Sequence, residues 1–94
     1  MAEPLEPALL GFALVPEVLN RTPPYVELVR QDSVADKAGL LADDLIVEIN
    51  GLSTASCRDV AKRLGQVDRD SPVTITIQRK SEFLSVTMSL LERN

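Results

Sequence analysis

The sequence contains no histidine and no tryptophan, only one cysteine, and 3% aromatic residues. Without histidine, a serine or cysteine nucleophile lacks the base that usually activates it. The single cysteine, Cys57, excludes an internal disulfide bond and is not enough to form a metal site. Carboxylates such as Asp43, Asp44, Glu48 and Glu27 are formal candidates for acid–base chemistry, but solvated acids at turns and strand faces explain them more simply. We therefore expect a non-catalytic module with no metal and no cofactor.

A basic excess and a long apolar run are also missing. The formal net charge is -4, whereas proteins that bind nucleic acid normally carry a basic excess, and few aromatic side chains are available to stack on bases. No apolar run approaches the roughly 20 residues that cross a bilayer. The N-terminus also lacks a basic region followed by an apolar one. We therefore expect no nucleic-acid partner and no membrane insertion.

The hydrophobic content is 45%, mostly aliphatic, which is sufficient for one core in a chain of 94 residues. We expect a single domain over residues 9–91 and a short tail at residues 92–94. Residues 1–8 contain two prolines and two glutamates. Because proline fits poorly in a strand interior, these residues are predicted to be a linker or N-terminal lead-in, ordered or frayed, and not a strand.

The apolar run LLGFALV at residues 9–15 is the main candidate for a binding site. Gly11 allows a tight turn, so the backbone amides of Leu10, Gly11 and Phe12 could converge on one anionic group such as a carboxylate. Residues 12–15 predict a short strand, and an exposed strand edge can accept a peptide through main-chain hydrogen bonds. The simpler alternative is that Gly11 only bends the chain into a buried strand.

The remaining strands are short and lie between helical segments. Strand patterns occur at residues 25–30 and 45–50, and alternating apolar residues over 73–78 and 84–90 indicate a hairpin. The predicted fold class is α+β, mainly β, in the form of a five- to six-stranded, partly open antiparallel barrel or sandwich capped by two helices.

The two helices are predicted from their capping signals. Ser33 is followed by Asp36, and Ser56 by Asp59, each at the spacing of a capping box. The first helix is predicted to end at Gly39 after one or two turns, and the second to reach about residue 65 or 67. Beside the core face of the second helix lies a narrower apolar stripe made of Cys57, Ala61 and Leu64.

From about residue 9 to residue 91 the chain resembles a PDZ domain. Residues 33–40 and 43–51 are similar to the family's block Ser-Pro-Ala-x-x-Ala-Gly-Leu and Gly-Asp-x-Ile-x-x-Ile-Asn-Gly, with Val34 and Asp43 replacing the usual proline and glycine. Residues 9–12 look like its carboxylate-binding loop, Gly-Leu-Gly-Phe. The final strand after a complete hairpin looks like the permuted bacterial type found in trypsin-like (HtrA/Deg-type) serine proteases.

The resemblance implies a groove that takes the C-terminal or unfolded segment of another protein by strand addition. The amides of Leu10, Gly11 and Phe12 would hold the terminal carboxylate, although no Arg or Lys precedes this loop. The implied groove is lined by Phe12, Ala13, Leu14, Val15, Cys57, Ala61 and Leu64. Leu64→Lys is accordingly expected to abolish binding and leave the fold intact.

The resemblance also implies a setting for the domain. It suggests the substrate-recognition or regulatory part of a larger serine protease, in the periplasm or cell envelope. The alternative is a regulatory or structural module whose groove is filled by the chain of its own parent protease and which controls assembly or activation.

Overall fold

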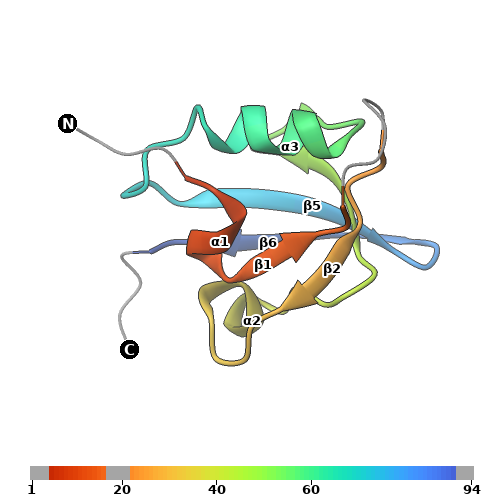
Figure 1. The fold of residues 1–94 in the computed structure, drawn as a ribbon, viewed down its shortest axis with the longest axis horizontal. Helices are drawn as coiled ribbons and strands as arrows, with labels where there is room; N and C mark the ends of the chain where they lie inside the picture. Colours follow the sequence, from red (N-terminus) through yellow and green to blue (C-terminus); the bar gives the residue numbers. More distant parts are fainter. Residues whose placement is uncertain (1–4, 17–21, 91–94) are drawn as a thin grey trace.

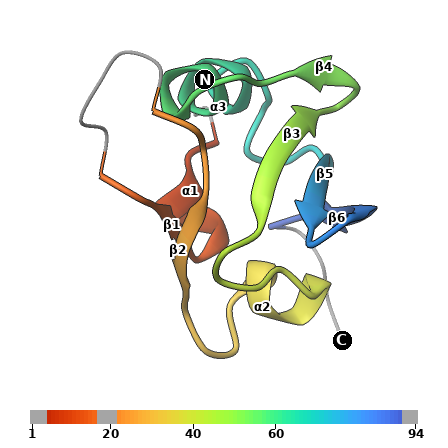
Figure 2. The same ribbon diagram turned by 90° about the vertical axis from the view of Figure 1, so that its right-hand side faces the viewer.

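The computed structural model describes residues 5–16 and 22–90, which form two antiparallel sheets and three helices (Figure 1). One sheet has the order β1-β2 and the other the order β4-β3-β5-β6. Helices α3 and α2 lie at opposite ends of the two sheets (Figure 2). The predicted fold class is confirmed, with one additional helix, α1. The elements are α1 (Pro7–Leu10), β1 (Phe12–Leu14), β2 (Val26–Val29), α2 (Val34–Ala38), β3 (Leu45–Ile49), β4 (Leu52–Ser53), α3 (Cys57–Leu64), β5 (Val73–Arg79) and β6 (Glu82–Met88).

The hairpin of β5 and β6 follows the alternation of its sequence. Val73, Ile75 and Ile77 are fully buried. The opposite face of the hairpin is polar, with Thr74 and Thr87 hydroxyl oxygens 3.1 Å apart across the strands. Since side chains alternate between the two faces of a strand, the inner face of this hairpin supplies a large part of the core.

Both predicted capping serines begin helices. Ser33 Oγ accepts a hydrogen bond from the Asp36 amide at 3.1 Å, and Ser56 Oγ accepts one from the Asp59 amide at 3.2 Å. Each aspartate in turn accepts from the amide of the residue before the serine, which satisfies further donors at the helix start. Helix α3 ends at Leu64, close to the predicted limit.

The N-terminal segment differs from the prediction. Leu5 belongs to the buried core, and its amide donates to Val67 O at 3.1 Å. Pro7 begins the short helix α1, where its missing N–H costs nothing. Residues 5–8 of the predicted linker or lead-in are therefore ordered and attached to the domain, and residues 1–4 lie outside the described residues, as do residues 91–94.

Candidate functional site

Strand β1 presents one of its edges away from its partner β2. The Arg30 amide donates to Gly11 O at 2.7 Å, and the Val15 amide donates to Tyr25 O at 3.0 Å. Since hydrogen-bonding directions alternate along an antiparallel strand, Phe12 and Leu14 direct their N–H and C=O groups to the opposite edge. Within residues 5–16 and 22–90, β1 pairs only with β2. This outer edge is therefore open to another strand.

Helix α3 begins beside the end of β1. Cys57 is 7% exposed, and its Sγ lies 3.8 Å from Val15 O and 3.6 Å from Pro23 O. The Cys57 amide donates to Thr22 O at 2.8 Å. These contacts hold the first turn of α3 against both ends of the β1–β2 connection. These contacts place the start of α3 beside the end of β1, the two elements between which the sequence predicts a groove.

The turn before β1 is built by Gly11. Its φ of 100° and ψ of 22° are in the left-handed region, and its amide donates to Pro7 O at 3.0 Å, which closes α1. The predicted convergence of three free amides is therefore incomplete in this structure. The Gly11 amide is already bonded within the chain, whereas the Phe12 amide points to the open edge.

The predicted groove side chains differ in exposure. Ala61 is exposed, and Ala13, Leu14 and Val15 are half-buried. Phe12 is buried in the core, and Leu64 has 0% of its surface exposed. Leu64 lies in the same buried cluster as Val60, so the expectation that Leu64→Lys leaves the fold intact is wrong. Of the three helix residues predicted for the groove, Ala61 alone has an exposed side chain.

A cation near the turn was missed from the sequence. Arg30 Nη2 donates to Ala8 O at 3.3 Å, which places a guanidinium beside α1 and next to the turn at Gly11. No local pattern could have found Arg30, because the register of β2 against β1 brings it there.

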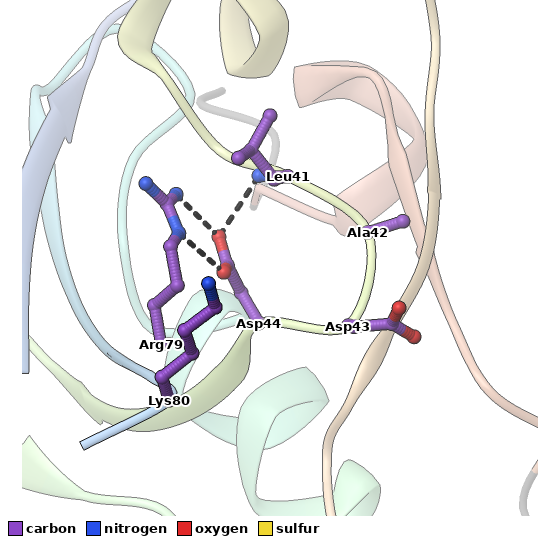
Figure 3. Close-up of a pocket in the computed structure, with 6 residues that line it drawn as sticks. All are labelled: Leu41, Ala42, Asp43, Asp44, Arg79 and Lys80. Carbon is purple, nitrogen blue, oxygen red and sulfur yellow. Dashed lines mark hydrogen bonds and ion pairs between the residues drawn. The ribbon is translucent and has the colours of Figure 1, made fainter. Parts of the chain in front are cut away.

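A pocket lies outside the region that is predicted to bind a ligand. A pocket of about 340 Å³ is lined by Leu41, Ala42, Asp43, Asp44, Arg79 and Lys80 (Figure 3).

The charged groups of this pocket, Asp44 and Arg79, form hydrogen bonds with each other and with the backbone. Asp44 is 1% exposed, and its two carboxylate oxygens each accept from Arg79 at 2.8 Å. Leu41 donates its amide to the same carboxylate, and Arg79 Nη2 also donates to Gly39 O at 2.9 Å. The hydrogen bond to Asp44 raises the pKa of Arg79, so the stability that comes from this raised pKa is fully present at neutral pH and is lost as the pH rises into the strongly alkaline range. We interpret this cluster as a structural connection between β5 and the loop before β3.

Arg79→Lys is expected to lower the free energy of unfolding by about 1–2 kcal/mol, because lysine keeps the charge but cannot make two parallel bonds to Asp44. Denaturant unfolding monitored by circular dichroism measures this loss. Lys80→Arg at the neighbouring exposed position is the control and should change stability by less than about 0.5 kcal/mol. Equal effects of the two substitutions would show that the paired geometry contributes nothing.

No metal-binding constellation and no membrane-spanning helix occur in the described part of the chain. No group of three or more His, Cys, Asp or Glu residues there is arranged to hold a metal ion. None of the helices described is long and apolar enough to cross a membrane.

The PDZ domain family model matches residues 25–79, which is more than half of the chain. The chain therefore belongs to the PDZ domain family.

Relatives in the curated proteins include proteases of two kinds. A putative zinc metalloprotease of Rhizobium meliloti (strain 1021) is 32% identical over 83 residues, which cover 86% of this chain and 22% of that protein. A probable periplasmic serine endoprotease, DegP-like, of Marinomonas sp. (strain MWYL1) is 37% identical over 65 residues, covering 67% of this chain and 14% of that protein. The chain thus spans less than a quarter of the length of these relatives.

Solved structures with the same fold include proteins determined together with peptides. The HtrA-type protease AlgW with a tripeptide matches with a TM-score of 0.67 and 19% identity, over 84% of this chain and 29% of that one. The HtrA3 PDZ domain bound to a phage-derived ligand matches with a TM-score of 0.62 and 20% identity, over 72% of this chain and 59% of that one. At these identities the likeness concerns the fold.

Proposed function

We propose that this PDZ domain binds the C-terminal segment of a partner polypeptide as an added strand along β1. The observation that carries the proposal is the outer edge of β1, where Phe12 and Leu14 direct their backbone groups away from β2 and α3 stands as the opposite wall. An extended peptide gains affinity from main-chain hydrogen bonds at such an edge and selectivity from the side chains around it. Peptide complexes of AlgW and HtrA3, which share the fold, support this function.

The terminal carboxylate is assigned to the turn formed by Leu10, Gly11 and Phe12. The Phe12 amide faces the edge already, and Arg30 adds a positive charge beside the turn. The groove is assigned to Phe12, Ala13, Leu14 and Val15 from the strand and Cys57, Ala61 and Leu64 from the helix. Since these residues are apolar or small, the ligand is expected to end in apolar side chains.

The setting proposed for the domain is the substrate-recognition or regulatory part of a larger protease. Both curated relatives described above are named as proteases, one of them a periplasmic serine endoprotease. A serine protease of the periplasm or cell envelope also agrees with the resemblance of the final strand to the permuted bacterial type of PDZ domain. The domain itself contributes recognition and no catalysis.

Titration with peptides that end in apolar residues tests the binding function. In amide NMR spectra, shifts at residues 10–15 and 57–64 are expected with free C-termini and are expected to be much smaller with amidated peptides. Equal shifts with both kinds of peptide would indicate recognition of internal segments. No shift with a varied set of peptides would contradict the proposal and favour a groove occupied by the parent's own chain.

Ala61→Lys is expected to weaken peptide binding by at least about tenfold, because a long charged side chain replaces an exposed methyl on the groove wall. Ala42→Lys is the matched control, since Ala42 is equally exposed but lines the second pocket. The control should keep its affinity within about twofold. Normal binding by Ala61→Lys would place the ligand elsewhere.

A further inference from the structure

We propose that Ser33 is a positioning residue for the turn at Gly11, and that it holds the peptide plane that aims the Phe12 amide at the ligand carboxylate. The inference rests on the proposed function and adds a residue that lies outside the proposed groove. It follows from the groups that contact the Gly11 carbonyl and from the close packing of Ser33 on Gly11.

The peptide bond between Gly11 and Phe12 connects the two sides of the strand. Because this bond is trans and planar, its C=O and its N–H point in opposite directions. The Gly11 carbonyl accepts from the Arg30 amide at 2.7 Å on the β2 side, so the Phe12 N–H is directed to the open edge. A group that fixes the Gly11 carbonyl therefore also fixes the direction in which Phe12 donates.

Ser33 is the second group that contacts this carbonyl. Its Oγ lies 3.5 Å from Gly11 O, at the long limit of a hydrogen bond. Its amide donates to Arg30 O at 3.2 Å, so residues 30–33 fold around the turn. The packing is close as well, because a Cβ on Gly11 would overlap the Cβ and Oγ of Ser33. The Ser33 side chain thus leaves the peptide plane little room to rotate toward α2.

The same side chain caps α2. Ser33 Oγ accepts from the Asp36 amide at 3.1 Å, which leaves the hydroxyl proton for Gly11 O. The cap and the contact with Gly11 respond differently to substitution. As an N-cap, glycine is tolerated much better than alanine, whereas in packing on Gly11 alanine keeps the Cβ and glycine loses it. The two roles therefore predict opposite rankings of Ser33→Ala and Ser33→Gly.

The test measures peptide affinity by NMR titration of the complete chain, a method that covers weak binding. The probes are decapeptides that end in valine or leucine, each prepared as a free acid and as an amide. Ser33→Gly is expected to weaken binding of the free acids by about tenfold and Ser33→Ala by about threefold, and both should change binding of the amides by less than about twofold. A loss restricted to the free acids locates the effect at the carboxylate.

Asp36→Ala is the matched control. The Asp36 carboxylate accepts from the Asp32 amide at 2.8 Å, so this substitution removes the other half of the capping box and leaves Ser33 Oγ on Gly11. It should lower the unfolding midpoint about as much as Ser33→Ala does, and it should keep the free-acid affinity within about twofold. Circular dichroism melting curves give the midpoint of each variant.

Four results would each overturn the inference and leave the proposed function standing. They are normal affinity of Ser33→Gly, weaker binding by Ser33→Ala than by Ser33→Gly, equal losses for free acids and amides, and a loss in Asp36→Ala as large as that in Ser33→Gly. A wild-type chain that binds both forms equally, or neither, would overturn the proposed recognition of the carboxylate and the role of Ser33 with it.

Discussion

Leu64→Lys is expected to unfold the domain. Leu64 is completely buried within the core cluster, so the substitution removes a packed aliphatic side chain and places a charge where water cannot reach it. The two effects together are expected to cost about 4 kcal/mol or more, which is comparable to the total stability at the lower end of the roughly 5–15 kcal/mol range of small domains. Loss of the folded far-ultraviolet circular dichroism spectrum and of the cooperative unfolding transition measures this.

Ala61→Lys provides the comparison on the same helix. Ala61 lies three residues earlier but is exposed, and lysine is nearly as good a helix former as alanine, so the unfolding midpoint should stay close to that of the wild type. Ala61→Lys should thus remove binding but keep the fold, whereas Leu64→Lys should remove both. A folded Leu64→Lys variant of normal stability would show instead that Leu64 faces the groove, as the sequence alone suggested.

Gly11→Ala is expected to cost about 2–4 kcal/mol, from two separate causes. An L-residue at φ of 100° pays for the left-handed backbone, about 1 kcal/mol. In addition, a Cβ at this position would overlap the Cβ and Oγ of Ser33, and such overpacking typically costs about 1–3 kcal/mol. Chemical denaturation of the variant against the wild type gives the sum of the two.

Gly39→Ala separates the backbone cost from the steric cost. Gly39 has nearly the same φ, 99°, but nothing lies within 4 Å of a Cβ built there, so its substitution should cost only about 1 kcal/mol. Adding Ser33→Gly to Gly11→Ala should recover the steric part, because glycine at this N-cap costs only a few tenths of a kcal/mol by itself. Equal losses for the two alanine variants would exclude the overlap with Ser33.

The features that were predictable are those encoded over a few neighbouring residues. The capping serines Ser33 and Ser56 begin α2 and α3 because their side chains bond to amides three residues away. The hairpin of β5 and β6 follows from strict alternation of apolar and polar residues. The strand after Gly11 was likewise expected, since glycine permits the turn that starts it. Short-range hydrogen bonding and periodicity determine these elements. The family could be recognised from the same local patterns.

The proposed groove between β1 and α3 was only partly predictable from the sequence. The sequence predicted one wall on the strand after Gly11 and the other on the helix after Ser56, and in the structure Cys57 Sγ lies 3.8 Å from Val15 O. The sequence did not distinguish which of two overlapping apolar stripes on α3 faces the core. Leu64 belongs to both stripes, and the position of the neighbouring elements decides between them.

Only the tertiary structure decided the contacts between residues far apart in the chain. Asp44 and Arg79, 35 residues apart, meet because the start of β3 pairs with the end of β5. Arg30 reaches Ala8, and Leu5 enters the core, for the same kind of reason. By itself the sequence determined the elements, their caps and the turn at Gly11, since those depend on bonds between near neighbours. Which side chains are buried and which amides remain for a ligand depends on strand register and on packing between elements, which no local pattern contains.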